Sequence, residues 1–478
     1  MPKHLLAFFM LAAGLGGCMT VGPDYQKPKV DVPAAWPGAS TEAPVSVRWW
    51  TLYNDPHLDL LIDEALAHNT DLRVAAARVD EALALLTVTR ADQLPNVKAN
   101  GTAGRNRFSQ NSALAFPGFN PEYNDYTVSL NASWEIDFWG KYRRATEAAR
   151  ADLLATQSAR DAVQLSLAAT VTRAYFNLRA LDAQVEITQQ RVETRAKALG
   201  LEKMRFDAGE SSELQYRQIE AETLQAKALL PVLEQQAAQQ ESALAVLVGR
   251  SPRDLMERGV DRGLAIEALI PPPAVPAGLP SDLLARRPDL YQAEQTLIAA
   301  NARIGVARAA YYPSISLTGI FGFESDSLSN LLNASSRLWT FSASAAQTVF
   351  DAGRTKGQVD AATARREQML AQYQGTVQNA FREVKDALVA SRKSAERLSA
   401  EQARVEALRT ALQLASMRYK AGESSLLDAL LAERSLLDAD LDRVAAQRDQ
   451  LSATTDLFQA LGGGWNGPAE KNAVAAKQ

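Results

Sequence analysis

MRFDAGESS runs from Met204 to Ser212, and MRYKAGESS runs from Met417 to Ser425. The two copies begin 213 residues apart, the difference between positions 417 and 204, in a chain of 478 residues. Repetition at a fixed interval indicates an architecture of repeated structural units, so it bears on the whole fold. We predict that the chain contains two versions of one long unit.

Further matching stretches extend the duplication beyond this phrase. The first half carries Thr70-Asp71-Leu72, Arg90 and Pro95 where the second carries Pro288-Asp289-Leu290, Arg308 and Pro313. Each half therefore reads as a helix, two strands, a very long helix, a glycine turn and a returning helix. The predicted fold is mostly α-helical, with a small β part and two internal structural repeats.

The repeated phrase itself predicts the tip of a helical hairpin. Gly209 and Gly422 each follow a helical stretch, where glycine readily adopts the left-handed backbone conformation that ends a helix. The serine pairs at 211–212 and 424–425 are suited to cap the returning helices, which we place at about 213–248 and 426–461. Pro231 lies inside the first returning helix and is expected to kink it.

Long coiled-coil helices precede both tips. Between Lys141 and Phe206 there is no proline and Gly200 is the only glycine, so one helix here would extend roughly 100 Å at about 1.5 Å per residue. Apolar residues recur at alternating intervals of four and three in both halves, which predicts coiled-coil packing. The seam positions are Leu167, Val171, Ala174, Leu178, Leu181, Val185, Thr188, Val192, Arg195 and Leu199, then Ala380, Val384, Ala387, Ser391, Ser394, Leu398, Glu401, Val405, Leu408 and Leu412.

The segment from Tyr126 to Phe138 alternates between apolar and polar residues. This period of two indicates a strand with one apolar and one polar face. The apolar face suits either a protein core or lipid. Three features favour lipid: an export signal, a length close to that of a membrane strand, and aromatic residues near the strand ends. These aromatic residues are Phe108, Phe116, Phe119, Tyr123, Trp139, Phe321, Phe323, Trp339 and Phe341.

Four such strands are expected, at about 96–109, 125–138, 313–324 and 338–349, although the first and the fourth alternate poorly. Four strands do not close a membrane barrel, whose smallest form takes about eight strands, and open sheet edges are not tolerated in lipid. Several copies of the chain must therefore build one barrel together. Two copies satisfy this count as well as three do.

The N-terminus predicts export and lipid attachment. Lys3 precedes an apolar run that ends in Leu15-Gly16-Gly17-Cys18, which resembles a bacterial lipobox. We expect removal of residues 1–17 and acylation of Cys18, with an ordinary signal peptide as the alternative. Met19, and not an aspartate, follows Cys18, which indicates the outer membrane. No apolar run long enough for a transmembrane helix follows.

Composition argues against several functional classes. The 51 basic and 55 acidic residues are nearly balanced, so the basic stripe that accompanies nucleic-acid binding is not expected. Three histidines and one cysteine are too few and too scattered for a metal cluster. Phosphate-binding glycine loops are absent from the sequence, and no set of nucleophile, base and orienting residue stands out. We expect neither a cofactor nor an enzyme activity.

These observations divide the chain into six parts. Residues 1–17 are the signal peptide, and 18–57 form a lipid-anchored, extended N-terminal segment. Residues 58–250 and 281–462 are the two structural repeats, joined by a proline-rich connector at 251–280. Residues 463–478 form a flexible tail.

Several motifs resemble those of the TolC-like outer-membrane factors, in their lipoprotein branch. The resemblance covers nearly all of the mature chain. It is carried by Cys18-Met19-Thr20-Val21-Gly22-Pro23-Asp24-Tyr25, Trp49-Trp50, Arg286-Arg287-Pro288-Asp289-Leu290, Tyr311-Tyr312-Pro313 and Arg418-Tyr419-Lys420-Ala421-Gly422. It implies a homotrimer with a 12-stranded β-barrel, four strands from each chain, continued by a coiled-coil periplasmic tunnel.

The same resemblance implies an exit duct in the outer membrane for a tripartite efflux pump. The implied partners are a periplasmic adaptor protein, an inner-membrane transporter and the lipid of the outer membrane. Leu431 stands where some members carry a second acidic gate residue. The implied entrance residues are Tyr419 and Asp428, and the glutamates that could supply further negative charge at the mouth instead are Glu423, Glu210 and Glu213. The expected adaptor-docking residues of the tips are Arg205, Gly209, Ser211, Arg418, Gly422 and Ser424.

Other interpretations remain open at this point. Each entrance carboxylate also has a favourable position at a helix N-terminus, and Arg205 and Arg418 end helices where positive charge is favourable. The duct could export polypeptides in a type I secretion system instead of small toxic compounds. The chain could also be a periplasmic coiled-coil structural lipoprotein without a channel.

Overall fold

The computed structural model describes residues 20–36, 47–109, 111, 121–272 and 280–465. The chain forms two compact units, each assembled from three stretches of sequence. Unit 1 comprises the described residues of Met1–Lys29, Arg78–Thr156 and Gln292–Gln374. Unit 2 comprises those of Val30–Ala77, Gln157–Tyr291 and Gly375–Gln478.

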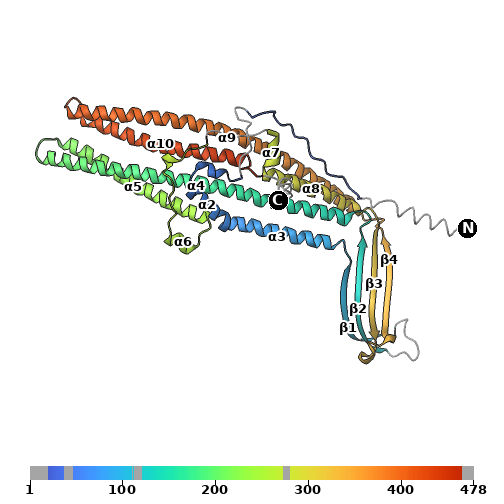
Figure 1. The fold of residues 1–478 in the computed structure, drawn as a ribbon. Helices are drawn as coiled ribbons and strands as arrows, with labels where there is room; N and C mark the ends of the chain where they lie inside the picture. Colours follow the sequence, from blue (N-terminus) through green and yellow to red (C-terminus); the bar gives the residue numbers. More distant parts are fainter. Residues whose placement is uncertain (1–19, 37–46, 110, 112–120, 273–279, 466–478) are drawn as a thin grey trace. The chain divides into compact units, whose positions relative to one another are not determined.

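Helices make up most of the described chain (Figure 1). The α-helices are α2 (Pro56–His68), α3 (Thr70–Ala91), α4 (Lys141–Asp207), α5 (Glu213–Leu247), α6 (Pro252–Glu257), α7 (Pro280–Arg286), α8 (Pro288–Ala309), α9 (Arg354–Lys420) and α10 (Leu426–Ala460). The 3₁₀ helices are η1 (Trp49–Tyr53), η2 (Ile266–Ala268), η3 (Leu328–Asn330) and η4 (Ala334–Ser336). The predicted long helices and returning helices are confirmed, and α5 continues as a helix across Pro231.

Corresponding helices in the two halves have equal lengths. Helices α4 and α9 each contain 67 residues, and α5 and α10 each contain 35. Helices α3 and α8 each contain 22 residues. All the predicted seam positions are buried or half-buried, so the heptad pattern identified the packed stripe of α4 and α9.

Unit 1 contains one antiparallel sheet in the order β1-β2-β3-β4. The strands are β1 (Asn96–Arg107), β2 (Glu122–Ile136), β3 (Ser314–Ser325) and β4 (Arg337–Ala346). All four predicted strands are present, with ends shifted by no more than a few residues. Strands β1 and β4 are the two edges of the sheet.

The strand register gives the sheet one apolar and one polar face. Leu130 pairs with Ala99 on one side and with Phe321 on the other, and Phe321 pairs with Trp339. Paired residues share a face, so small residues of the edge strands join the large ones of β2 and β3. The apolar face comprises Val97, Ala99, Gly101, Ala103, Tyr126, Val128, Leu130, Ala132, Trp134, Ile136, Ile315, Leu317, Gly319, Phe321, Phe323, Trp339, Phe341, Ala343 and Ala345. Edge strands with poor alternation in sequence thus complete an apolar surface.

The core of unit 2 joins the two helical hairpins. Trp49 of η1 stacks on Phe458 of α10, with ring centroids 5.1 Å apart, and both rings are fully buried. Tyr53 packs edge-to-face on Phe176 of α4 at 4.9 Å, and its hydroxyl lies 3.0 Å from that of Thr455. Aromatic burial therefore ties the segment before α2 to one helix from each hairpin.

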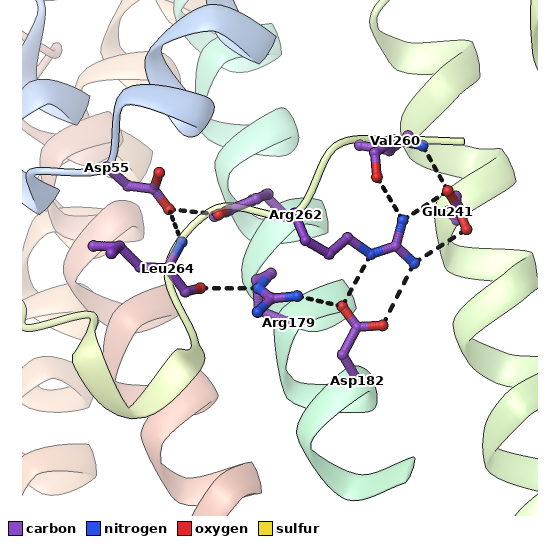
Figure 2. A network of polar contacts seen from close by, with 8 residues as sticks. Asp55, Arg179, Asp182, Glu241, Val260, Arg262 and Leu264 are labelled. Atoms are coloured by element: carbon purple, nitrogen blue, oxygen red, sulfur yellow. Dashed lines mark hydrogen bonds and ion pairs between the residues drawn. The ribbon is translucent and has the colours of Figure 1, made fainter. Parts of the chain in front are cut away.

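A polar network holds the segment between α6 and η2 to the first hairpin (Figure 2). Arg262 lies between Asp182 of α4 and Glu241 of α5, with its Nε 3.1 Å from Asp182 and its Nη1 2.7 Å from Glu241. The Glu241 carboxylate also accepts the backbone N–H of Val260 at 2.6 Å. The hydrogen bonds from Arg262 lower the pKa of Glu241, and those to Glu241 and Asp182 raise the pKa of Arg262.

Candidate functional site: the hairpin tips

The two tips of unit 2 adopt one backbone geometry. Gly209 and Gly422 have φ angles of 73° and 76°, in the left-handed region predicted from the sequence. The N–H of Glu210 donates to the carbonyl of Arg205 at 2.8 Å, and the glycine N–H closes the inner bond of a Schellman motif at 3.0 Å. The second tip repeats both bonds, at 2.9 Å and 3.0 Å.

Capping boxes start both returning helices. The Ser212 hydroxyl accepts the N–H of Gln215 at 3.3 Å, and the Gln215 side chain accepts the N–H of Ser212 at 3.0 Å. In the second tip Ser425 and Asp428 make the same pair of bonds, at 3.3 Å and 3.1 Å. Of the serines in each pair, the second one is therefore the cap.

Asp428 thus has a structural partner inside its own chain. Its Oδ2 accepts bonds from both the N–H and the hydroxyl of Ser425. The side chain is also exposed to solvent. The Ser-x-x-Asp spacing at 425–428 is a capping-box signal, so sequence alone contained this second role.

The serines that do not cap, Ser211 and Ser424, share an unusual environment. The Oγ atom of each is buried, and neither has a hydrogen-bond partner among the described residues. They occupy equivalent places in the two tips. Ser211 and Ser424, two of the predicted docking residues, precede the returning helices and lie in the turns.

The acidic residues of the tips face solvent. Glu210, Glu423 and Glu213 are exposed. Within the part of the chain that the structure describes, the Glu210 and Glu423 carboxylates form no ion pair, whereas Glu213 lies 3.4 Å from Arg217 one turn along α5. Of the three predicted entrance glutamates, Glu210 and Glu423 therefore remain available for a ligand or a neighbouring subunit.

One polar contact connects the two tips directly. Arg205 Nη1 lies 3.5 Å from the hydroxyl of Tyr419, at the long limit for a hydrogen bond. This bond and the nearby Glu202 carboxylate raise the pKa of Arg205. Tyr419 also packs beside the buried apolar residues Ile219, Leu426 and Leu430. The structure thus brings two predicted site residues together, while the Arg418 side chain is exposed.

Both tips expose apolar side chains in the same register. Leu201, Met204 and Leu214 of the first tip are 57%, 63% and 67% exposed. Their counterparts Leu414, Met417 and Leu427 are 53%, 50% and 45% exposed. Exposed apolar groups at repeated positions are typical of an interaction surface.

The sequence analysis placed Thr188 and Arg195 in the seam but did not identify a buried polar stripe there. Thr188, Arg195 and Glu202 follow one another at heptad spacing on α4, and all three are buried. Arg195 Nη1 donates to the carbonyl of Glu222 at 2.7 Å and to its carboxylate at 3.1 Å. Its Nε lies 3.6 Å from Glu433 of α10. Arg195 therefore links the first hairpin to the second, and the polar interruptions of the heptad were the signal for it.

Cys18 lies outside the described residues, but the segment that follows it packs tightly in unit 1. Gly22 has a φ of 107° and approaches Gly305 of α8 so closely that a Cβ atom on Gly22 would lie 2.5 Å from the Gly305 Cα. Asp24 accepts a 2.6 Å bond from Arg144 of α4, whose side chain is buried. Gly22 and Asp24 therefore hold this segment against α8 and α4.

The described ranges lack two kinds of feature. No helix there combines the length and hydropathy needed to cross a membrane. In the same ranges, no three histidine, cysteine, aspartate or glutamate side chains are grouped as metal ligands.

Known proteins similar to this chain are outer-membrane components of efflux pumps. The model of the outer membrane efflux protein family matches residues 61–250 and 279–463. The probable efflux pump outer membrane protein TtgC of Pseudomonas putida is 35% identical over 478 residues, covering 97% of this chain and 96% of that protein. The cation efflux system protein CusC of Escherichia coli is 35% identical over 476 residues, covering 97% and 99%.

A solved structure has the same fold along nearly the whole chain. The CmeC outer membrane channel of Campylobacter jejuni matches with a TM-score of 0.90 at 25% identity, covering 96% of this chain and 98% of that one. These relatives favour efflux over polypeptide secretion and over a structural lipoprotein. The chain belongs to the outer membrane efflux protein family, and it is an outer-membrane efflux channel and not an enzyme.

Proposed function

We propose that three copies of the chain form the exit duct of a tripartite pump, with a 12-stranded barrel in the outer membrane and a coiled-coil tunnel in the periplasm. The observation that carries this proposal is the four-stranded sheet, which has an exposed apolar face and two edge strands, β1 and β4. Lipid suits such a face, and pairing of β4 with β1 of the next copy satisfies the edges.

The two edges of unit 1 also carry different exposed apolar groups. Helix α3 directly precedes β1 in the chain. Its exposed apolar residues near that end are Leu83, Leu85 and Val88, whose exposed fractions are 52%, 57% and 62%. Val349 and Phe350 follow β4 and are 94% and 87% exposed. Different surfaces at opposite edges favour a head-to-tail ring over a two-fold dimer. We propose a ring of three copies, which is the number that the structural neighbours support.

We assign the entrance of the duct to the hairpin tips. Exposed Glu210, Glu423 and Asp428 from three copies would make acidic rings, which favour cations. Tyr419 and its bond to Arg205 hold the two tips of one copy together. Glu213 contributes less negative charge because Arg217 neutralises it.

The exposed leucine and methionine residues of the tips are the proposed dock for a periplasmic adaptor protein. Methionine side chains adapt to irregular partner surfaces, which suits a joint that tolerates movement. Arg205, Gly209, Ser211, Arg418, Gly422 and Ser424 form the polar part of this dock. An inner-membrane transporter supplies the energy, and the cargo is a class of small toxic compounds.

We further propose that Cys18 carries the lipid anchor after removal of residues 1–17. Residues 18–57 then form the anchored N-terminal segment. The equal lengths of α4 and α9 and of α5 and α10 support two structural repeats, at 58–250 and 281–462. Residues 251–280 connect the repeats, and 463–478 form the tail.

Single-channel conductance of the detergent-purified protein in a planar bilayer, with its mass measured in parallel, tests this proposal. A trimer with a small, cation-selective conductance supports the shared barrel and the acidic entrance. A monomeric mass for well-folded protein that never conducts would overturn the shared barrel. A trimer with anion-selective conductance would overturn the acidic entrance alone.

A further inference from the structure

Charges on the apolar face of the sheet are confined to one end. Residues paired in the register share a face, and Arg105 and Arg107 of β1 follow Ala103 on that face with the same alternation. Arg337 of β4 pairs with Phe323 and lies two residues from Trp339 on the same face. We call Arg105, Arg107 and Arg337 the rim arginines. They stand at the end of the sheet next to the 108–121 and 326–336 connections.

Acidic residues at this end lie mainly on the opposite face. Asp125 pairs with Gly104, and Glu324 pairs with Thr127, so both belong to the polar face. Glu122 is the one acidic residue that the register puts among the rim arginines. It lies 3.0 Å from Arg105 and 3.3 Å from Arg107.

The rim therefore has a net positive charge on its apolar side. Three arginines and the single Glu122 leave a formal charge of +2 for each chain. Arg337 is exposed and forms no ion pair with any described residue. The nearest residues of Arg337 on this face are Phe323 and Trp339, and neither carries a carboxylate. The rim thus presents guanidinium groups beside a surface suited to lipid.

We propose that the rim arginines bind phosphate groups of an anionic glycolipid in the outer leaflet. This inference rests on the proposed barrel, in which Arg337 of one copy comes next to Arg105 and Arg107 of the following copy. Guanidinium groups bind phosphate oxygens in pairs of parallel hydrogen bonds, so arginine suits a phosphorylated head group. Trp339 and Phe341 on the same face are 73% and 70% exposed and suit the acyl chains of that lipid.

The test measures the thermal stability of the full-length purified protein in detergent. The probes are lipopolysaccharide, the same lipopolysaccharide after enzymatic removal of its lipid A phosphates, and inorganic phosphate. We compare the wild type with the triple variant R105Q/R107Q/R337Q. The matched control is Lys98→Gln, which removes one exposed positive charge from the polar face of β1.

Phosphorylated lipopolysaccharide is expected to raise the Tm of the wild type and of Lys98→Gln equally, and to raise that of the triple variant by less than half as much. The proposal would be overturned if the dephosphorylated lipid raised the Tm of the wild type as much as the phosphorylated lipid does. It would also be overturned if the phosphorylated lipid raised the Tm of the triple variant as much as that of the wild type. An equal shift with inorganic phosphate would reduce the rim to a free-phosphate site and overturn the lipid assignment.

Mass and conductance measured on the same preparations separate this inference from the proposed function. A wild type that is neither trimeric nor conducting would contradict the shared barrel. A conducting trimer whose Tm does not change when lipopolysaccharide is added would contradict the rim site alone. Arg337→Gln as a single variant repeats the test if the triple variant does not form trimers.

Discussion

Single residues decide the geometry of each tip. A Cβ atom at Gly209 or Gly422 would meet no other atom within 4 Å, so space does not require glycine there. The positive φ angles of 73° and 76° do require it, because other residues pay about 1 kcal/mol or more in that region. The Schellman bonds depend on this conformation and bring Glu210 and Glu423 to the end of each tip.

Gly209→Ala and Gly200→Ala should have opposite effects. Gly200 lies exposed within α4, where alanine is favoured over glycine by about 1 kcal/mol. At Gly209, alanine should weaken the Schellman bonds by about 1 kcal/mol, which corresponds to roughly fivefold faster local opening. Hydrogen exchange measured by mass spectrometry on peptides that cover 205–212 checks this. Slower exchange in Gly209→Ala than in the wild type would contradict the assigned role of φ.

Asp428 variants can separate a pore charge from a helix cap. Asp428→Asn keeps an oxygen for the N–H of Ser425 but removes the negative charge, so cation selectivity should fall while the α10 start stays protected from hydrogen exchange. Asp428→Ala should lose both the negative charge and the acceptor for the Ser425 N–H. We expect it to weaken the helix cap by about 1 kcal/mol and to raise the leak conductance. Tyr419→Ala should also raise the leak, because it removes the contact with Arg205. Unchanged selectivity in Asp428→Asn would leave Asp428 only its capping role.

At the scale of elements, the two hairpins differ along their seams. The first hairpin buries Thr188, Arg195 and Glu202, whereas the position of α9 equivalent to Arg195 is Leu408. A buried guanidinium is stable only with its charged and carbonyl partners in place. The first seam therefore depends on acidic residues of α5 and α10.

Arg195→Leu places on α4 the residue that α9 carries at the equivalent position. The change removes the guanidinium partner of Glu222 and leaves Glu433 only its ion pair with Arg191. We expect a loss of about 2 kcal/mol, less than for a fully buried pair because both acids retain some exposure. Hydrogen exchange in α4 and α10 near these residues should accelerate. The reverse change, Leu408→Arg, puts a guanidinium beside the buried apolar residues Val405, Leu436 and Ala439 and serves as the destabilising control. Slower exchange in Arg195→Leu would show that hydrophobic packing outweighs the ion pairs.

The connector network predicts a pH effect on the segment around Val260. The pKa of Glu241 is lowered in the folded protein, so its contribution to stability is present above its unfolded pKa of about 4.3 and is lost as the pH falls through the lower, folded value. Hydrogen-exchange protection at 258–266 should therefore decrease below about pH 4. Glu241→Gln should already reduce protection at pH 6 and should flatten the acid dependence. A wild-type profile that stays flat down to pH 3 would contradict this assignment.

At the scale of the whole molecule, assembly follows from what one chain leaves uncovered. The sheet has an apolar face and two edges, and different apolar groups are exposed beside β1 and after β4. Each of these features costs free energy in a solvated monomer. In the proposed assembly, ring closure pairs the two edges and buries the groups beside them, and lipid covers the apolar face.

Phe350→Asp should therefore weaken the trimer. Phe350 is 87% exposed in the single chain and borders β4, so a charge there should oppose burial against the next copy. Met256→Asp is the matched control, because Met256 is 84% exposed on α6 in unit 2. Trimer yield on unheated detergent gels, with far-UV circular dichroism to verify folding, measures the effect. Equal trimer yields for the two variants would contradict the proposed interface.

Sequence by itself determined what depends on local stereochemistry and periodicity. The glycine tips, the helix lengths and the strands are set by backbone preferences over a few residues or by periods of 3.5 and 2, which are readable along the chain. The repeat of MRFDAGESS as MRYKAGESS located both tips and indicated that the chain contains two versions of one unit. The resemblance to the family then supplied the duct, which the comparisons confirmed.

Only the tertiary structure decided which distant residues meet. It paired Arg205 with Tyr419, Arg195 with Glu433, and Asp24 with Arg144. It also put the small residues of the edge strands on the apolar face, because register and not composition assigns a residue to a face. A polar residue in a heptad seam, such as Arg195, is visible in the sequence, but the partner of each such residue is not, since it depends on how whole elements come together in space.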